Sequence, residues 1–244
     1  MSKKERKEKL NIPQKNSLQI AEECQICGGR EFVINEEGKA VPCSCRKDKE
    51  VIRRLIEFGI PPKFRNKSLD NFSAPDKRRK EILDTAQRTA TSFDPSKMEK
   101  QGLLLRGSVG SGKTHIAIGF LKVVIEKGYT GLYVNVPEIL RRIRRTYSAA
   151  AEETESEIIE ELTDCDLLVL DDLGAEAATG WVRDRLYLVI NALYENNKTL
   201  IVTSNCSLAE LEEQVGPRIT SRLCELCHEL PEFPNEDYRR LLMK

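Results

Sequence analysis

Residues 102–116 read GLLLRGSVGSGKTHI, and the central segment at 107–114 fits the pattern G-x-x-x-x-G-K-[ST]. An apolar run typical of a buried strand precedes this segment and a helix-patterned run follows it, which is the setting that the pattern requires. The glycines permit a tight loop whose amide groups face a phosphate, and the positive end of the following helix points to the same place. We therefore expect a nucleotide-binding loop made of Gly107, Ser108, Val109, Gly110, Ser111, Gly112, Lys113 and Thr114.

The last two residues of this loop have distinct expected roles. Lys113 would reach the β- and γ-phosphates of ATP, and the Thr114 hydroxyl would bind Mg²⁺. The alternative is a glycine-rich turn that arose by chance, and the flanking strand and helix patterns weigh against it.

A Mg²⁺ site also needs a carboxylate at the end of a neighbouring strand. The stretch LLVLDDLG (167–174) places Asp171 and Asp172 directly after four apolar residues. We expect Asp171 to hold the metal through water and Asp172 to polarise the attacking water as a general base. The next apolar run ends at Asn205, whose amide could hydrogen-bond the γ-phosphate or the lytic water. Solvated loop acids and a turn-forming asparagine are the alternatives.

Apolar runs typical of strands alternate with helical segments from about residue 77 onward. This alternation predicts an α/β fold with a parallel sheet and helices on both of its faces. The expected strands are GLLLR (102–106), GLYVNV (131–136), DLLVL (166–170) and TLIVTSN (199–205).

Composition restricts the class of protein. The 244 residues include 39 Lys+Arg and 39 Asp+Glu, so no overall charge favours nucleic acid or a membrane, and any basic surface must be local. The first ten residues, MSKKERKEKL, are charged and no apolar run follows them. We therefore expect a soluble, cytoplasmic protein without a signal peptide or a membrane span. Eight cysteines in a reducing compartment are better explained as metal ligands or buried thiols than as disulfides.

Four of these cysteines form two close pairs within residues 24–45, a C-x-x-C and a C-x-C. Four thiolates complete a tetrahedral Zn²⁺ shell. The stretch between the pairs (30–42) predicts a β-hairpin that turns around residues 35–38 and brings the pairs together. Metal would stabilise a segment that is too small to bury a core of its own. The alternative is four unrelated reduced thiols, and the expected zinc ligands are Cys24, Cys27, Cys43 and Cys45.

The stretch VPEILRRIRRTY (136–147) predicts an amphipathic helix. Its apolar side chains from Ile139 to Tyr147 occupy about 100° of arc, and arginines occupy the other side. Exposed cations beside an aromatic ring suit the backbone and bases of single-stranded DNA. The alternative is that the arginines are solvated or pair with the acidic run at 152–161. The expected DNA contacts are Arg141, Arg142, Arg144, Arg145 and Tyr147.

The motifs, in this order, resemble those of the AAA+ ATPases and, more narrowly, those of the DnaC/DnaI helicase loaders and the IstB-type transposition helpers. The resemblance spans roughly residues 55–240 and includes GIPPKFRN (59–66), LLVLDDLGAE (167–176), TSN (203–205) and RITSRL (218–223). It implies an AAA+ P-loop NTPase domain that lacks a C-terminal lid domain.

The same resemblance implies the roles of further residues. Arg222 would reach the ATP of a neighbouring subunit as an arginine finger, and Arg218 would support that interface in the ATP-bound assembly. The two nucleotide motifs would lie on adjacent strands of the sheet. Relatives often carry an arginine where this chain has Leu193, so any role of that arginine is in doubt here.

Partners and domain order also follow from the resemblance. Loaders of the DnaI type carry an N-terminal zinc module that contacts the replicative helicase, and the IstB-type helpers are not expected to have one. We expect a helicase loader of DNA replication initiation that uses ATP, Mg²⁺ and Zn²⁺ and binds the replicative DNA helicase and single-stranded DNA. The expected domains are a charged tail (1–20), a zinc-binding module with a helix (21–60), a linker (61–76) and an AAA+ ATPase domain (77–244).

Three other functions are compatible with some of these motifs. An IstB-like transposition helper would act with a transposase on duplex DNA and would tolerate loss of the cysteines. A small-molecule P-loop kinase would act as a monomer and would not need Arg222. A zinc adaptor would bind ATP without turnover.

Residues 224–228, CELCH, match the haem-attachment sequence C-x-x-C-H. Haem attachment at this sequence normally needs export, which conflicts with a cytoplasmic protein. We expect Cys224 and Cys227 to be buried thiols near one face of the helix that carries Arg222. The same interpretation applies to Cys165 and Cys206.

Overall fold

The computed structural model describes residues 24–43, 45–97, 100–148 and 150–237, with residues 47–52 described by backbone alone. The chain divides after Arg65 into two compact units, residues 1–65 and residues 66–244. The predicted charged tail at 1–20 lies outside the described residues. Among the described helices, none has the length and apolar character that crossing a bilayer requires.

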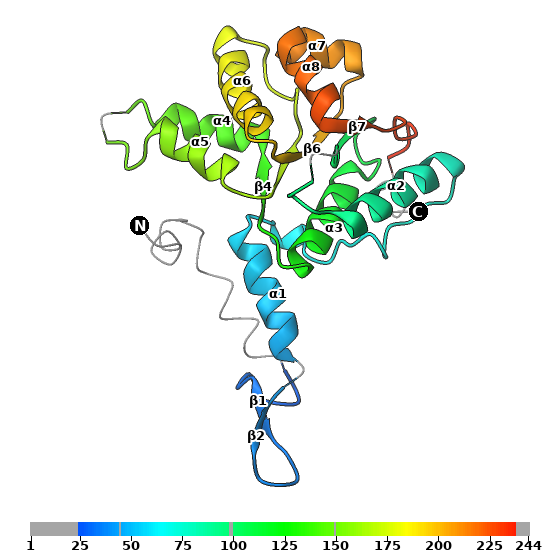
Figure 1. Ribbon diagram of the computed structural model, residues 1–244, viewed down its shortest axis with the longest axis vertical. Helices are drawn as coiled ribbons and strands as arrows, with labels where there is room; N and C mark the ends of the chain where they lie inside the picture. Colours follow the sequence, from blue (N-terminus) through cyan, green and yellow to red (C-terminus); the bar gives the residue numbers. More distant parts are fainter. Residues whose placement is uncertain (1–23, 44, 98–99, 149, 238–244) are drawn as a thin grey trace. The chain divides into compact units, whose positions relative to one another are not determined.

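The first unit contains a short β-hairpin followed by a helix (Figure 1). Strands β1 (Phe32–Ile34) and β2 (Ala40–Pro42) pair antiparallel with Val33 opposite Val41. The Asn35 side-chain oxygen accepts hydrogen bonds from the amides of Glu37 and Lys39, which closes the turn. The hairpin predicted around residues 35–38 is therefore confirmed. Helix α1 (Cys45–Glu57) and a single 3₁₀ turn, η4 (Pro62–Phe64), complete this unit.

The second unit is an α/β domain built on a five-stranded parallel sheet in the order β4-β5-β6-β3-β7. Its strands are β3 (Gly102–Arg106), β4 (Gly131–Asn135), β5 (Leu167–Asp171), β6 (Thr199–Ser204) and β7 (Cys227–Glu229). Its helices are α2 (Lys77–Ser92), α3 (Lys113–Glu126), α4 (Val136–Arg145), α5 (Glu155–Thr163), α6 (Gly180–Glu195), α7 (Leu208–Val215) and α8 (Pro217–Leu226). The four strands expected from the sequence are present. The short β7 was not expected.

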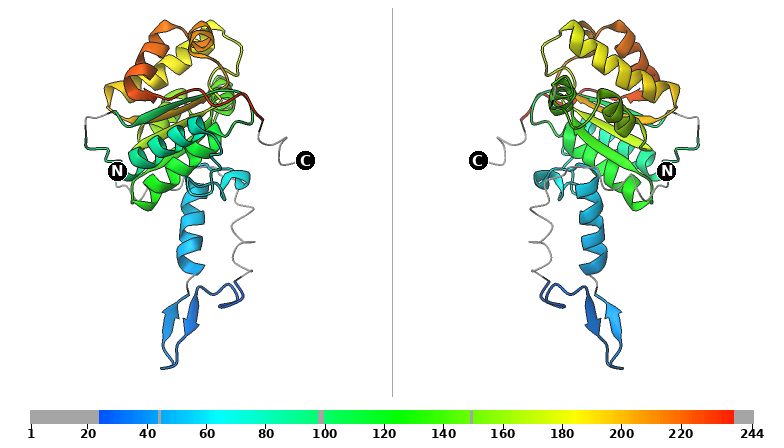
Figure 2. Two further views of the ribbon diagram at one scale, coloured as in Figure 1. Left: turned by 90° about the vertical axis from the view of Figure 1, so that its right-hand side faces the viewer. Right: turned by 90° about the vertical axis from the view of Figure 1, so that its left-hand side faces the viewer.

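Helices cover both faces of this sheet (Figure 1, Figure 2). Helices α2 and α3 lie on one face, and α6, α7 and α8 lie on the other. Helices α4 and α5 contribute apolar side chains to the core that α6, α7 and α8 share with the sheet. Leu193 is fully buried in that core.

Side chains alternate between the two faces, as strand geometry requires. On β3, Leu104 joins the core beneath α6 and α8, while Leu103 and Leu105 are buried toward the opposite layer. Each such leucine contributes about 1.5–3 kcal/mol by its burial. Because every strand is parallel, the carboxyl ends of β3, β5 and β6 lie at one edge of the sheet, where ligands bind in open α/β sheets.

One expectation about the sheet is wrong. The phosphate loop follows β3 and the paired carboxylates end β5, but these strands are not adjacent because β6 lies between them. Strand β6 pairs with β3 along one side and with β5 along the other. Side chains at the end of β6 can therefore touch both nucleotide motifs.

The C-x-x-C-H sequence is split between two elements. Helix α8 ends at Leu226 and Cys227 begins β7. The expectation that Cys224 and Cys227 share one face of a helix is therefore wrong. Cys227 is buried and its thiol donates to the Leu200 carbonyl oxygen at 3.1 Å, and burial raises its pKa. His228 Nε2 lies 2.7 Å from the Lys100 carbonyl oxygen.

The four thiols of the second unit differ in how deeply they are buried. Cys165 is buried like Cys227, and burial raises its pKa to about 12. Cys206 and Cys224 are only half-buried, so the expectation of buried thiols is met only in part by these two.

Candidate functional site

The loop at 107–114 lies between β3 and α3, as the sequence predicts. Gly112, directly before α3, has a φ of 111°, a left-handed conformation that favours glycine. The Lys113 ammonium donates hydrogen bonds of 2.8 Å to the Gly107 and Ser108 carbonyl oxygens and to Asn205 Oδ1. The loop lysine and the asparagine after β6 thus belong to one site.

The segment that follows β7 runs along the phosphate loop. The Phe233 amide donates to the Arg106 carbonyl oxygen at 2.8 Å, and the Phe233 backbone bridges to Gly107. Farther along, the Asp237 carboxylate lies against Gly110, where a Cβ would collide with it. No sequence motif marks this segment, and only its pairing with β3 brings it to the site.

A small aromatic cluster lies beside the loop. The Phe72 ring makes edge contacts with the rings of His115 and Phe233, with centroids 5.2 and 6.4 Å away. A Cβ on Gly112 would lie 2.6 Å from the Phe72 ring. Burial lowers the pKa of His115, which favours a neutral imidazole at neutral pH. Sequence reasoning missed this cluster because its members lie far apart in the chain.

The Asp171 carboxylate is buried at the end of β5 and accepts three hydroxyl hydrogen bonds. Thr114 Oγ1 donates to Asp171 Oδ1 at 2.8 Å, and Thr203 Oγ1 donates to the same oxygen at 2.7 Å. The Tyr133 hydroxyl donates to Oδ2 at 2.7 Å. The predicted metal ligands Thr114 and Asp171 are therefore in direct contact, and Tyr133 and Thr203 are additions that the sequence did not indicate.

Asp172 is held in an unusual backbone conformation. Its φ is 63°, in the left-handed region that few residues other than glycine adopt. The Asp172 amide donates to Thr203 Oγ1 at 3.0 Å, and Asn135 Nδ2 donates to the Asp172 carboxylate at 3.3 Å. Neighbouring strands therefore fix this backbone conformation, and such strain concentrates at functional sites.

The residues at this edge fit a nucleotide with Mg²⁺. A hydroxyl and a carboxylate, joined by the bond from Thr114 to Asp171, are oxygen donors of the kind that Mg²⁺ prefers. The Ser111 hydroxyl is buried and has no hydrogen-bond partner among the residues that the structure describes. An unpartnered donor within the loop suits a ligand that supplies oxygen acceptors, as phosphate does.

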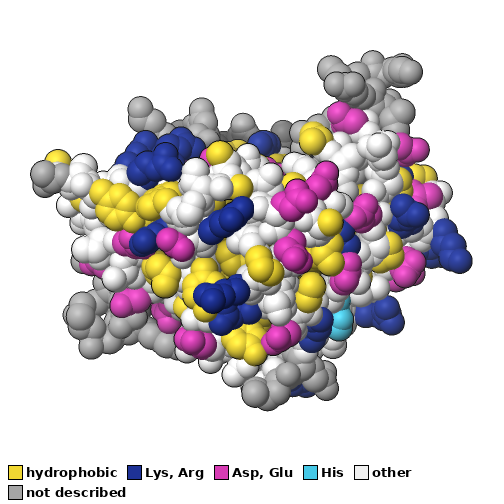
Figure 3. All heavy atoms as spheres, turned by 90° about the horizontal axis from the view of Figure 1, so that it is seen from above, with side chains coloured by type: hydrophobic (Ala, Val, Ile, Leu, Met, Phe, Trp, Pro, Cys, Tyr) yellow, Lys and Arg dark blue, Asp and Glu magenta, His cyan; other side chains and the backbone are white. Residues whose placement is uncertain are grey.

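Arg222 lies on α8 with its guanidinium stacked on two tyrosines of α6. The guanidinium carbon is 4.6 Å from the Tyr187 ring centroid and 5.5 Å from that of Tyr194. Such cation–π contacts hold an arginine in a defined orientation. Arg218 is exposed on the same helix. On the face that Figure 3 shows, basic and acidic side chains are dispersed among apolar ones, without one dominant charge.

The arginine helix is only partly as expected. Ile139 and Ile143 on its apolar side are buried, as expected. On its other side Arg141, Arg144 and Arg145 are exposed. The remaining arginine, Arg142, is half-buried and ion-paired at 2.6 Å with both Glu153 and Glu161 of the acidic run. The expectation of four exposed cations is therefore wrong for Arg142, and the alternative of pairing with the acidic run holds for it. The hydrogen bonds that its guanidinium donates to Glu153 and Glu161 raise the pKa of Arg142.

Tyr147 lies beyond the end of α4, which stops at Arg145, so it does not share the buried apolar face. It is 56% exposed, and its ring packs edge-on against Trp181 with centroids 6.3 Å apart. The Arg144 guanidinium lies over the same Trp181 ring at 4.7 Å. An exposed tyrosine, a half-buried tryptophan and a cation therefore lie together at the end of α4, and Trp181 was not foreseen.

The four N-terminal cysteines come together as predicted. The Sγ atoms of Cys24, Cys27, Cys43 and Cys45 lie within 4.8 Å of one another, and no other group of three metal-ligating side chains occurs among the described residues. Two separations are 3.4 and 3.9 Å, close to the about 3.8 Å that a tetrahedron of Zn–S bonds requires. Burial raises the pKa of the Cys27 thiol, but hydrogen bonds from Cys45 and the Glu31 backbone outweigh it and lower the pKa to about 6.

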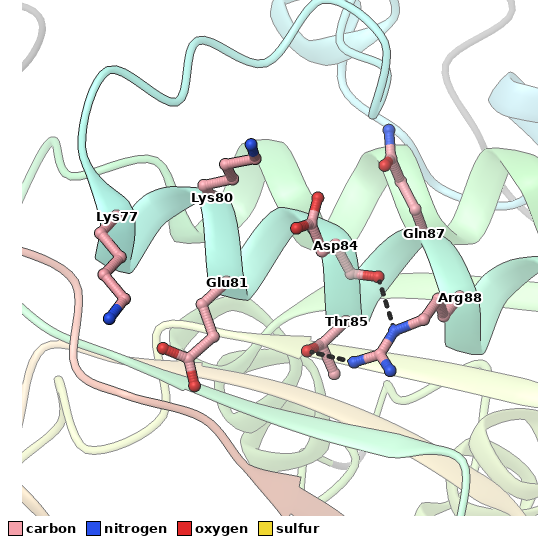
Figure 4. A pocket seen from close by; sticks show the side chains of 7 residues that line it. All are labelled: Lys77, Lys80, Glu81, Asp84, Thr85, Gln87 and Arg88. Carbon is pink, nitrogen blue, oxygen red and sulfur yellow. Dashed lines mark hydrogen bonds between the residues drawn. The ribbon is translucent and has the colours of Figure 1, made fainter.

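A shallow hollow lies along the exposed side of α2 (Figure 4). Charged side chains such as Lys77, Glu81 and Arg88 line it, and Arg88 bonds to Thr85 and to the Asp84 carbonyl oxygen within the same helix. None of the predicted site residues lines this hollow.

Comparison with known proteins agrees with this geometry. Residues 66–241 match the family described as IstB-like ATP binding protein. The replicative helicase loader DnaC of Escherichia coli strain K12 is 21% identical over 191 residues, which cover 77% of this chain and 76% of that protein.

Two solved structures have the same fold. A DnaC helicase loader superposes with a TM-score of 0.63 at 26% identity, covering 70% of this chain and 98% of the other. A DnaI structure gives a TM-score of 0.63 at 25% identity, covering 73% and 94%. The predicted AAA+ fold of the DnaC/DnaI type is therefore confirmed.

Proposed function

Because the chain belongs to the family of IstB-like ATP binding proteins, we propose that it hydrolyses ATP and thereby loads a replicative helicase onto single-stranded DNA. One observation carries this proposal. Two hydrogen bonds of 2.8 Å, from Thr114 to Asp171 and from Lys113 to Asn205, join the phosphate loop to the ends of two other strands. Such a junction is what P-loop hydrolysis needs.

Each group at this junction has a role in the proposed reaction. The loop amides bind the phosphates, and Lys113 exchanges its carbonyl partners for phosphate oxygens. Thr114 and Asp171 hold Mg²⁺, which when bound neutralises the phosphate charge. Asp172 accepts a proton from the attacking water, and Asn205 orients that water or the γ-phosphate.

Paired substitutions test the hydrolysis. Lys113→Ala should lose ATP binding, whereas Asp172→Asn should bind ATP but lose turnover, since it keeps the shape of the side chain without its basicity. Asp84→Asn, an exposed acid on α2, is the matched control. Turnover by Asp172→Asn at the rate of the parent protein would show that Asp172 is not the base.

The proposed assembly places Arg222 at the ATP of a neighbouring subunit, with Arg218 supporting the contact. The support is the position of Arg222 on α8, stacked on Tyr187 and Tyr194, which presents a preorganised cation beside the half-exposed Tyr194 ring. An arginine delivered in this way neutralises charge that develops during hydrolysis.

We also propose that the first unit binds the helicase and carries zinc on its four cysteines. Its hairpin exposes an apolar face, because Phe32 and Ile34 of β1 lie opposite Pro42 and Ala40 of β2 and all four are exposed. An apolar face of this kind suits contact with another protein.

Single-stranded DNA would bind at the exposed arginines of α4 and the aromatic rings beyond it. Arg141 and Arg145 would contact phosphates, and Arg144 and Tyr147 supply a cation and a stacking surface beside Trp181. Arg142 instead ties α4 to the acidic segment that follows.

A transposition helper is the second candidate, and its support is limited to the IstB-like description of the matched family. Such a protein would act on duplex DNA with a transposase and would not need the four N-terminal cysteines. Activity that survives replacement of these cysteines, together with preference for duplex over single strands, would support this candidate.

A further inference from the structure

The Asp171 carboxylate is surrounded by hydroxyl groups from three different elements. We propose that Tyr133 and Thr203 are positioning residues, whose hydroxyls fix this carboxylate so that a single acceptor position is left for the hydrated Mg²⁺ of the nucleotide site. The inference rests on the proposed ATPase function and adds two residues that act through Asp171.

Tyr133 reaches Asp171 from the neighbouring strand. In the register of β4 and β5, Tyr133 lies opposite Val169. Val169 and Asp171 are two residues apart on β5, so their side chains and that of Tyr133 point to the same face of the sheet. Its side chain is buried, and the hydroxyl donates to Asp171 Oδ2 at 2.7 Å.

Thr203 reaches the same carboxylate from the other side. It lies on β6, between the strands of the two nucleotide motifs, and is fully buried. Its hydroxyl donates to Asp171 Oδ1 at 2.7 Å and accepts from the Asp172 amide at 3.0 Å. One hydroxyl therefore fixes the proposed metal-holding acid and the backbone of the proposed general base together.

The hydrogen bonds account for most of the acceptor capacity of Asp171. A carboxylate has about four lone-pair positions. Thr114 and Thr203 fill the two on Oδ1, and Tyr133 fills one of the two on Oδ2. The position that is left lies on Oδ2, which restricts Asp171 to one contact with the hydrated ion and sets its direction.

Removal of the Tyr133 hydroxyl should affect metal binding more than nucleotide binding. Tyr133→Phe keeps the buried ring but removes the hydrogen bond to Asp171 Oδ2. The Asp171 carboxylate can then rotate, and Oδ2 is no longer held in one orientation toward the ion. Partners of this kind typically change metal affinity about 10–100-fold when they are removed. The phosphate loop does not contain Tyr133, so binding of ATP without metal should change less than about two-fold.

The experiment measures binding of a fluorescent ATP analogue in EDTA and then during titration with Mg²⁺. Tyr133→Phe should raise the Mg²⁺ midpoint at least about 10-fold, with metal-free affinity retained. Tyr129→Phe, a partly exposed tyrosine beside Phe93, is the control and should behave as the parent protein. A purely structural role for the hydroxyl would lower Tm and leave the Mg²⁺ midpoint unchanged, and that result would overturn the inference.

A second pair of variants decides the matter if Tyr133→Phe does not fold. Thr203→Val should raise the Mg²⁺ midpoint, and Thr203→Ser, which keeps the hydroxyl, should restore it. Equal midpoints for the two Thr203 variants would contradict the inference. The proposed function fails separately: a parent protein whose ATP binding does not respond to Mg²⁺ at all would refute the ATPase site itself.

Discussion

Replacement of Cys43 by serine should unfold the cysteine hairpin and leave the ATP-binding unit intact. Within residues 24–43 the only buried side chains are Cys27 and Cys43, so the thiols themselves are the core of this segment. An isolated two-stranded hairpin is marginally stable at best. Structural zinc contributes an apparent free energy of about 10–16 kcal/mol in small zinc-binding peptides, so its loss removes the main source of stability.

Amide hydrogen exchange measures how much stability the hairpin loses in Cys43→Ser. The hairpin amides donate within the segment, for example Cys43 to the Glu31 carbonyl oxygen and Asn35 to that of Lys39, both at 2.9 Å. A loss of more than about 4 kcal/mol accelerates their exchange more than about 700-fold, since each 1.4 kcal/mol is a factor of ten. The assay is exchange over residues 31–43 by mass spectrometry, together with metal analysis, which should give about one zinc per chain before the change and none after.

A matched control is Cys206→Ser, which removes a half-buried thiol from the other unit. It should keep the zinc and the protection of the hairpin. Protein purified without chelator that contains no zinc, or a Cys43→Ser hairpin that stays protected, would refute the reasoning.

Three further outcomes are expected. Arg141→Glu with Arg145→Glu should weaken single-stranded DNA binding and flatten its salt dependence while ATP affinity stays constant, as measured by fluorescence anisotropy at several salt concentrations. Arg222→Ala should lower ATPase activity by up to about 10³-fold, and mixing it with inactive Lys113→Ala subunits should restore part of the activity, because one type of mixed interface has both groups. Cys227→Ser should retain ATPase activity and lose about 1–2 kcal/mol of unfolding free energy, measured by denaturation, because the thiol packs in the core and donates to the Leu200 carbonyl oxygen.

Controls separate these outcomes from general damage. Lys77→Glu with Lys80→Glu makes the same change of charge on α2 and should leave DNA binding unaltered. If both double variants lost the same DNA affinity, the arginines of α4 would be ordinary solvated side chains and not DNA contacts. A co-assembled mixture that is as inactive as its two components would exclude Arg222 as the arginine finger. Loss of activity in Cys227→Ser would reopen a ligand role for that thiol.

The sequence predicts those parts of the fold that depend on local patterns. The phosphate loop, the four longer strands and the cysteine hairpin all follow from short apolar runs, glycines and a turn asparagine. Strand β7 was missed because its three residues, CHE, have no strand pattern and form a strand only by pairing with β3. The placement of Cys227 on a helix was wrong for the same reason.

The site is less predictable where it depends on the order of strands. Thr203 touches both acids because β6 lies between the strands of the two motifs, and this order is not encoded in any local pattern. Tyr133 looks like an ordinary apolar strand residue until the register of β4 on β5 is known. Arg142 looks like a free cation because its partners Glu153 and Glu161 lie 11 and 19 residues away.

The most direct test of the account is a helicase-loading measurement on circular single-stranded DNA. The assay uses the replicative helicase of the organism that encodes the chain and measures the helicase that stays bound to the circle after ATP is added. The account predicts that the parent protein increases bound helicase, and that Phe32→Ser with Ile34→Ser, on the exposed hairpin face, abolishes the increase while ATP binding persists. Glu36→Ser with Lys39→Ser, two exposed polar residues of the same hairpin, should load normally. No increase in bound helicase with the parent protein, in the presence of ATP and Mg²⁺, would contradict the account.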